Sequence, residues 1–268
     1  MIFTSVIDPV AFELGALQIR WYGLLFSGGF VLGYFIMQYW FRRRRYPTTD
    51  LDRLLVYVFL GTVIGARLGH CLIYEPDYFL SSPLEILKVW KGGLASHGGT
   101  LGVIVSMMIF NRHHRYRLLE LMDMLCIPVL LVCVLIRLGN FCNAEIVGIP
   151  TSGHWGVIFA RLGENFPRHP AQLYEALCYL ILFVSLGWLY LKHGFSLPCG
   201  LTLGLSITLI FMSRLIVEFV KVEQADYTTG TVLTVGQLLS VPFVLGGLAV
   251  CLWAWRHGRA PAPLKDRA

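Results

Sequence analysis

The chain has 268 residues, of which 56% are hydrophobic and only 14% are charged. Soluble domains carry about 25% charged and about 45–50% apolar residues, so this chain departs from them on both counts. Its mean hydropathy of +0.65 points the same way. These values exclude a disordered chain, a soluble nucleotide-binding enzyme and a disulfide scaffold, and they favour a polytopic membrane protein.

Seven apolar stretches are suited to cross a membrane as helices of about 20 residues. We expect spans at about 21–41, 54–74, 94–110, 118–137, 172–191, 196–219 and 231–255. We therefore predict an all-α polytopic membrane protein with about seven transmembrane helices, in which residues 1–268 form a single integral membrane domain. The segment of about 138–170, between the fourth and fifth spans, is rich in Gly, Pro and His, and we expect it to form a small extracytoplasmic cap.

Basic residues are distributed unevenly between the loops. If the N-terminus lies outside, 13 of the 22 lysines and arginines fall in inside segments, 6 fall in outside segments, and the other 3 lie in or at the ends of spans. The positive-inside rule therefore predicts that the N-terminus is outside and the C-terminus is in the cytoplasm. Because this topology accounts for the net charge of +6, we expect no nucleic-acid partner.

The seven cysteines show no Cys-x-x-Cys motif and no spacing typical of metal ligands. Most lie within apolar runs, where cysteine behaves as a small buried hydrophobe. We therefore expect no metal and no cofactor. We also expect no cleavable signal peptide, because the first apolar run is long and no small-residue cleavage site follows it.

A histidine bracketed by glycine pairs stands at the start of the third predicted span. The stretch reads Gly92-Gly93-Leu94-Ala95-Ser96-His97-Gly98-Gly99. Glycine permits irregular backbone and the close approach of a ligand, and a neutral imidazole can accept a proton near neutral pH. His97 is therefore a candidate general base, and the alternative is a structural histidine in a glycine-rich turn.

A second polar cluster begins at the outer end of the fourth predicted span. Arg137, Asn140 and Asn143 are spaced three residues apart, so on a helical turn they share a face, and Glu145 and Gly148 follow them. A guanidinium can bind phosphate oxygens in a bidentate manner. The cluster therefore suits a phosphate or glycerol headgroup, and the alternative is an interfacial arginine that reaches lipid headgroups beside capping asparagines.

Charged residues inside spans are costly and are candidates for function by default. Arg214 and Glu218 lie four residues apart in the sixth predicted span, where they can neutralise each other, and a structural ion pair is the alternative. Arg67, with Arg137 and Arg214, could line an anion path. Trp21-Tyr22-Gly23 is either an interfacial aromatic belt or part of a site.

Taken together, these motifs resemble those of the prolipoprotein diacylglyceryl transferase family. The most specific match runs from Arg137 to Gly148 and fits the family signature of Arg, Gly-Asn-Phe, Asn, Glu and Gly. The Ser96–Gly99 turn, the Arg168–Glu175 stretch and the Arg214–Glu218 pair also occur in the expected order. The resemblance extends from Ile7-Asp8-Pro9 to Gly236-Gln237.

The resemblance implies a multi-pass enzyme of the bacterial cytoplasmic (inner) membrane. Such enzymes move the diacylglyceryl group of phosphatidylglycerol onto the thiol of the lipobox cysteine of a preprolipoprotein, form a thioether and release glycerol phosphate. The partners would be phosphatidylglycerol, the lipobox peptide and membrane lipid. His97 would assist thiol deprotonation, Arg137 would bind the phosphate, and Arg214 would be a second anionic anchor. The residues that would bind substrate beside Arg137 are Tyr22, Asn140, Asn143, Glu145, Gly148 and Glu218.

The chain also departs from the family pattern. Ile210 stands where the family usually carries Tyr, Ile136 where it usually carries Gly, and Lys221–Gln224 replaces a loop that runs from a basic residue to Pro-Asp. These departures would suit a divergent paralogue with an altered substrate range. An anion or lipid transporter is less favoured because the two halves show no clear repeat. An intramembrane serine protease is less favoured because Pro150–Gly153 is the nearest approach to Gly-x-Ser-Gly.

Overall fold

The computed structural model describes residues 2–15, 17–89, 92–114, 116–194, 196–222 and 234–260. Within it the chain divides into two compact units. The first consists of the described residues within 2–37 and 122–260, and the second of the described residues within 38–121. The predicted single domain over residues 1–268 stays a prediction, as does the side of the membrane on which each loop lies.

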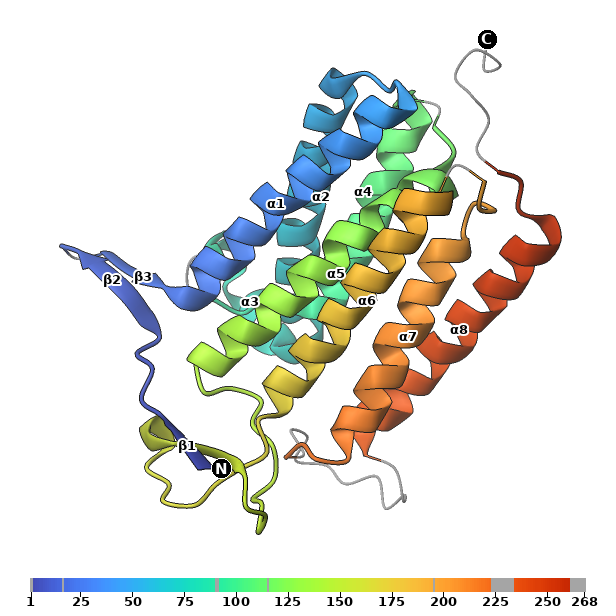
Figure 1. Cartoon of the computed structure of the whole chain (residues 1–268). Coiled ribbons are helices and arrows are strands. Elements are labelled where there is room, and N and C mark those ends of the chain that lie inside the picture. The colour runs from blue at the N-terminus through green and yellow to red at the C-terminus, as the bar shows by residue number, and fades with distance from the viewer. Residues whose placement is uncertain are drawn as a thin grey trace. The chain divides into compact units, whose positions relative to one another are not determined.

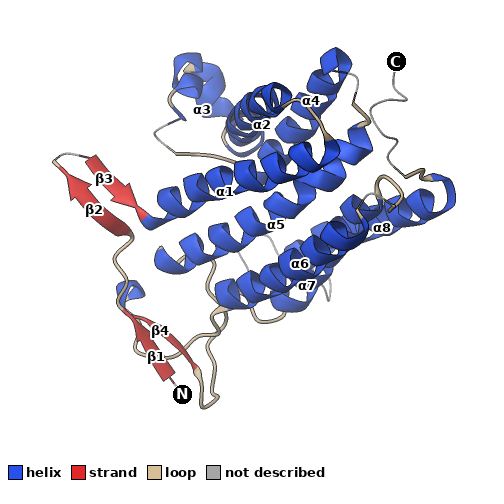
Figure 2. Cartoon of the chain, turned by 45° about the horizontal axis from the view of Figure 1, so that its top comes forward, coloured by secondary structure: helices blue, strands red, loops and turns tan. Residues whose placement is uncertain are grey.

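Helices make up most of the described chain (Figure 2). The long helices are α1 (Trp21–Arg44), α2 (Thr48–Gly69), α4 (Ser96–His114), α5 (Leu118–Cys142), α6 (Ala171–His193), α7 (Leu201–Glu218) and α8 (Val235–His257). A π-helical turn η1 (His70–Tyr74), the short helix α3 (Pro76–Ser81) and the 3₁₀ turns η2 (Pro83–Leu87) and η4 (Ala160–Leu162) complete the helical elements in the described residues.

Within the described residues, six helical stretches are long and apolar enough to cross a membrane. They correspond to α1, α2 with η1, α5, α6, α7 and α8. The predicted all-α polytopic membrane architecture is therefore confirmed. The remaining predicted span coincides with α4, which forms as a helix but has a glycine-rich start and ends in Arg112, His113 and His114. These residues lower its mean hydropathy below that of the other long helices.

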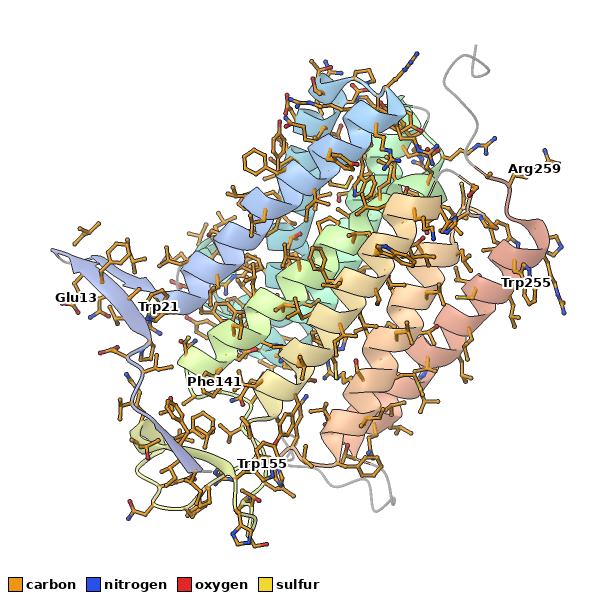
Figure 3. The ribbon with its side chains drawn as sticks, in the orientation of Figure 1. Glu13, Trp21, Phe141, Trp155, Trp255 and Arg259 are labelled. Atoms are coloured by element: carbon orange, nitrogen blue, oxygen red, sulfur yellow. The ribbon has the colours of Figure 1, made fainter. Side chains whose placement is uncertain are left out.

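Large apolar side chains point outward along the helices. Phe35 of α1 is 58% exposed, Ile216 of α7 is 65% exposed and Trp255 of α8 is 78% exposed. Figure 3 shows Trp255 directed away from its helix. Scattered surface residues of this kind occur on any protein, but rows of them along helices of this length match a surface that faces lipid.

In the first unit, glycines set how closely the helices approach. A Cβ on Gly29 of α1 would lie 3.0 Å from Val132 of α5, and a Cβ on Gly204 of α7 would lie 2.7 Å from the Cys251 sulfur of α8. Figure 1 shows α7 and α8 running alongside each other. Small residues at such contacts let helix backbones pack in lipid, where burial from water does not drive association.

A small apolar core joins α5, α6 and α7. It consists of Val134, Ala176 and Tyr179, against which Ile210 packs. Ile210 is one of the departures from the family pattern. It fills space in this core, which gives its apolar character a packing role.

The start of α7 is fixed by a carboxylate from α5. Asp123 is 4% exposed, and it accepts hydrogen bonds from the backbone N–H groups of Gly200 at 2.6 Å and Leu203 at 2.7 Å. The first N–H groups of a helix have no partner within the helix. A carboxylate also interacts favourably with the positive end of the helix dipole. Asp123 therefore caps α7 from another helix, although the sequence shows it only as a charge inside a span.

Two small sheets lie outside the helices in the first unit. β1 (Ile2–Ser5) pairs in parallel with β4 (Gly156–Phe159), with Ile2 opposite Gly156. β2 (Val10–Leu14) and β3 (Leu17–Arg20) form an antiparallel hairpin that leads into α1. The N-terminal strand thus ties down the segment after α5, which we call the cap segment (residues 143–170). α5 continues to Cys142, so Arg137 and Asn140 are helical.

In the second unit, a glycine seam joins α2 to α4. A Cβ on Gly65 would lie 2.3 Å from the carbonyl oxygen of Gly98, and a Cβ on Gly102 would lie 1.9 Å from that of Gly61. No side chain fits at these separations, so the two backbones touch directly. The four-residue glycine spacing in the sequence is thereby explained by helix packing.

Candidate active site

Arg137 lies near the C-terminal end of α5 and is held by two helices. Its Nε lies 2.7 Å from the Glu175 Oε2 of α6, and Glu175 is fully buried. Its Nη1 donates to the Asn140 Oδ1 at 3.2 Å, and the Tyr179 hydroxyl interacts with it electrostatically. A buried carboxylate beside a guanidinium compensates the cost of removing both charges from water. The guanidinium plane is therefore fixed in one orientation.

The backbone turns sharply where α5 ends. The N–H of Glu145 donates to the carbonyl of Asn140 at 2.9 Å, and the N–H of Ala144 donates to the carbonyl of Phe141 at 3.1 Å. This is the hydrogen-bond pattern of a Schellman motif, with Ala144 at the left-handed position and a φ of 54°. The turn brings Glu145 back over the last turn of α5.

The Glu145 carboxylate is bound by two amides. Asn140 Nδ2 donates to its Oε2 at 3.1 Å, and Asn143 Nδ2 donates to its Oε1 at 3.2 Å. Gln172 of α6, which is fully buried, donates to the Glu145 carbonyl at 2.6 Å. Arg137, Asn140, Glu145 and Asn143 thus form a continuous polar chain. The spacing that predicted a shared face for Arg137 and Asn140 is matched by this direct hydrogen bond.

Tyr22 approaches the same chain from the first turn of α1. Gly139 makes this approach feasible, because a Cβ there would lie 2.8 Å from the Tyr22 ring. The Tyr22 side chain interacts electrostatically with Glu145 and Arg137. Tyr22, Ser27 and Asn143 also line an open hollow beside the hairpin residues Gln18 and Arg20.

Gly148 joins three segments of backbone. Its N–H donates to the carbonyl of His169 at 3.0 Å, and it forms a bridge with Lys221. A Cβ at this position would lie 2.3 Å from the His169 carbonyl oxygen and 2.6 Å from that of Val220. Gly148 therefore fixes the cap segment between the start of α6 and the end of α7.

The expected ion pair between Arg214 and Glu218 is not among the ion pairs of the described residues. Glu218 instead lies 3.4 Å from the Lys221 Nζ, and Lys221 donates to the Glu175 Oε1 at 2.7 Å. Glu175 thus bridges Arg137 and Lys221. Arg214 interacts electrostatically with Tyr179, the residue that also contacts Arg137.

Sequence reasoning missed Glu175, Lys221, Tyr179 and Gln172 as members of this cluster. Glu175 stands out in the sequence as a charge within a span, but its two cationic partners come from different helices. The sequence signals were this unexplained charge and the place of Glu175 in the Arg168–Glu175 stretch that resembles the family pattern. The pairing itself depends on how α5, α6 and α7 pack.

His97 belongs to the second unit and is the second residue of α4. Its side chain is exposed. Arg67, which we considered as a lining of an anion path, is 4% exposed, and all three of its guanidinium nitrogens donate to backbone carbonyls. Arg67 is therefore a structural cation, which argues against that path.

The described residues contain no group of three or more His, Cys, Asp or Glu side chains arranged to hold a metal ion. The polar groups of the cluster are instead an arginine, amides, a tyrosine and carboxylates that are already paired. Such groups can bind an oxyanion and orient a polyol. In the residues described here they provide no evident metal centre.

Comparison with known proteins places this arrangement in context. Residues 9–253 match the family model described as prolipoprotein diacylglyceryl transferase. A relative from Tolumonas auensis is 50% identical over 246 residues, which cover 91% of this chain and 95% of the relative. A relative from Chloroherpeton thalassium is 46% identical, with 90% of each chain covered. One from Porphyromonas gingivalis is 43% identical over 93% of this chain and 94% of its own. All three are named phosphatidylglycerol--prolipoprotein diacylglyceryl transferase.

Proposed function

The chain belongs to the prolipoprotein diacylglyceryl transferase family, and from this premise we propose that it transfers the diacylglyceryl group of phosphatidylglycerol to a prolipoprotein cysteine. The acceptor is the lipobox cysteine of a preprolipoprotein. The product is a thioether, and the reaction is the first step of lipoprotein maturation. The relatives' names and the Arg137 cluster support this proposal.

The reaction requires one bond to form and one to break. The cysteine sulfur attacks the glyceryl carbon that carries the phosphate, and the C–S bond forms as the C–O bond breaks. The electron pair of that bond leaves with glycerol phosphate. The thiol proton passes to a base, because the thiolate is the nucleophile.

The fixed guanidinium of Arg137 is the observation that carries the proposal. Its Nε faces Glu175, and Asn140 accepts from Nη1. The guanidinium has five N–H donors, and the described partners leave some of them available for phosphate oxygens. Because the arginine is held before the lipid arrives, it can stabilise the charge that develops on the leaving group without reorganising.

We assign thiol deprotonation to His97 and anion binding to Arg137 and Arg214. A free thiol has a pKa of about 8.5, so little thiolate exists at neutral pH without a base. A neutral imidazole can accept that proton. Tyr22, Asn140, Asn143, Glu145, Gly148 and Glu218 shape the headgroup site, in which Glu218 acts through Lys221.

We further propose that the protein lies in the cytoplasmic (inner) membrane with its N-terminus outside. The excess of basic residues in alternate loops supports this orientation. It places the cap segment and the end of α5 on the side where secreted prolipoproteins arrive.

Substitution of Arg137 tests the headgroup role. In a transfer assay with phosphatidylglycerol and a lipobox peptide, we expect Arg137→Ala to lose about 10²–10³ in rate. Arg137→Lys should recover little, because lysine lacks the bidentate fork. Arg161→Ala is a matched control, since Arg161 is 49% exposed and pairs with Asp8 at 3.4 Å. Near-normal transfer by folded Arg137→Ala would contradict the assignment.

His97→Gln tests the base. Glutamine keeps a hydrogen-bonding side chain but cannot accept the proton at neutral pH. We expect most of the activity to be lost, because glutamine cannot take up the thiol proton as a neutral imidazole can. A His97→Gln variant with the wild-type rate and pH profile would show that His97 is structural.

A further inference from the structure

Arg67 of α2 binds the loop that precedes α4. Its Nη2 donates to the carbonyl of Glu85 at 2.6 Å and its Nε to that of Ile86 at 2.9 Å. Its Nη1 donates to Gly92 at 2.5 Å and to Gly93 at 3.2 Å. The guanidinium carbon also lies 4.9 Å from the centre of the Phe79 ring. One side chain thus holds two separate stretches of backbone.

The Gly92-Gly93 turn is shaped to meet this guanidinium. The two glycines have φ values of 86° and 73°, which residues other than glycine rarely adopt. A Cβ on Gly93 would lie 2.5 Å from the His70 ring and 2.9 Å from the Arg67 Nη1. The turn therefore closes directly onto Arg67 and His70.

The residues at the start of α4 are also held by contacts with α2. The N–H of Ala95 donates to the carbonyl of Ala66, the neighbour of Arg67, at 2.9 Å. α4 begins at Ser96, and Gly98 packs against Gly65 and Gly69 of α2. His97 lies between these two attachments. Its exposed side chain has no hydrogen-bond or ion-pair partner among the described residues, so its position is set by the backbone.

We propose that Arg67 is a positioning residue for His97, an inference that rests on the proposed function and adds a residue to it. Arg67 holds the turn from which α4 starts, and the α2–α4 glycine seam holds the helix that follows. Together they fix the backbone from which the imidazole extends, without any direct contact to the ring. The buried cation is satisfied by carbonyl groups, so its charge is used for structure and not for binding an anion.

Arg67→Lys in a double-mutant cycle with His97→Gln tests the proposal. Lysine keeps the charge but presents its donors from a single atom, so it cannot reach all four carbonyls. A small displacement of a catalytic group can cost about 10²-fold in rate. We expect Arg67→Lys to lower kcat by about that factor and to leave the KM for phosphatidylglycerol nearly unchanged. In the His97→Gln background the same substitution should cost less than about 2-fold.

Arg53→Lys is the matched control, because Arg53 lies on the same helix with its side chain 63% exposed. We expect it to change neither kcat nor KM. Equal losses from Arg67→Lys in both backgrounds, or a loss confined to KM, would overturn the positioning role.

Hydrogen exchange gives a second readout that does not depend on activity. We expect Arg67→Lys to speed exchange at the amides of residues 92–99, while Arg53→Lys does not. Unchanged exchange there would show that Arg67 does not hold the turn before α4. If the wild type failed to transfer the diacylglyceryl group but the exchange effect appeared, the proposed function would be wrong. The role of Arg67 in holding the turn before α4 would still be supported.

Discussion

Two residues beside Glu145 adopt backbone conformations that suit glycine. Ala144 and Ile146 have φ values of 54° and 56°. The left-handed region costs an L-residue about 1–2 kcal/mol, and strain of this kind often accompanies functional sites. Here it turns the chain so that the Glu145 carboxylate meets Asn140 and Asn143.

Ala144→Gly should therefore stabilise the protein. Glycine adopts this φ without strain, although it also gains freedom in the unfolded chain. We expect a net increase of about 0.5–1 kcal/mol in the free energy of unfolding. The control is Ala249→Gly on an exposed face of α8, where glycine should destabilise by up to about 1 kcal/mol. Chemical denaturation in detergent micelles measures the change in the free energy of unfolding for each variant. Changes of the same sign would show that Ala144 is not strained.

The cap segment contains an ion pair whose effect depends on pH. Arg168 donates to both oxygens of Glu164 at 2.5 Å. These hydrogen bonds lower the pKa of Glu164 below its usual range and raise that of Arg168. Arg168 also donates to the carbonyl of Gly148 at 3.1 Å, which links the pair to the Gly148 junction.

A lowered folded-state pKa means that the pair stabilises the protein when Glu164 is ionised. The contribution is fully present above the unfolded pKa of about 4.3 and is lost as pH falls through the lower folded value. At pH 7 we expect the wild type to have a slightly higher melting temperature than Glu164→Gln. The difference should be small because the pair is partly exposed. The margin should vanish in acid. A difference in melting temperature that stays constant from pH 7 to acid would contradict this assignment.

Sequence spacing groups the residues of the candidate site better than it identifies their partners. Arg137, Asn140 and Glu145 are close in the chain, so helical spacing and one turn suffice to group them. Glu175 and Lys221 come from other helices, and no local pattern pairs them with Arg137. The Arg214–Glu218 pair satisfied the helical spacing rule, yet Glu218 lies closer to Lys221.

At the scale of elements, the close approach of α2 and α4 predicts that their glycines tolerate no side chain. A Cβ on Gly65 would lie 2.3 Å from the Gly98 carbonyl oxygen, and backbone cannot yield as a flexible side chain does. We expect Gly65→Ala to separate the helices and to reduce the yield of folded protein severely. Gly28→Ala of α1 is the control, since nothing lies within 4 Å of its Cβ. Normal yield and melting temperature for Gly65→Ala would disprove the close approach.

Long apolar helices were predictable because their composition alone identifies them. α4 was predicted as well, although its polar ends make it the least apolar of the set. The strands β1 and β4 were not predicted, because Ile2 pairs with Gly156 far along the chain. Asp123 was likewise visible only as a charge, because the helix that it caps lies elsewhere in the sequence.

For the whole molecule, the topology is the first matter to test. We expect Ser152→Cys, in the cap segment, to react with an impermeant thiol reagent from outside the cell. Thr48→Cys, at the start of α2, should react only after the membrane is opened. The orientation follows from the basic residues of alternate loops. The opposite pattern of labelling would reverse it.

The central claim is that this protein moves a diacylglyceryl group from a phospholipid to a thiol. The most direct measurement uses phosphatidylglycerol that carries one isotope in its acyl chains and another in its phosphate. After incubation with purified protein and a lipobox peptide, we predict that the acyl label joins the peptide through a thioether. The phosphate label should appear as glycerol phosphate in equal amount. Transfer of neither label by folded wild-type protein, or of both labels to the peptide, would contradict the account.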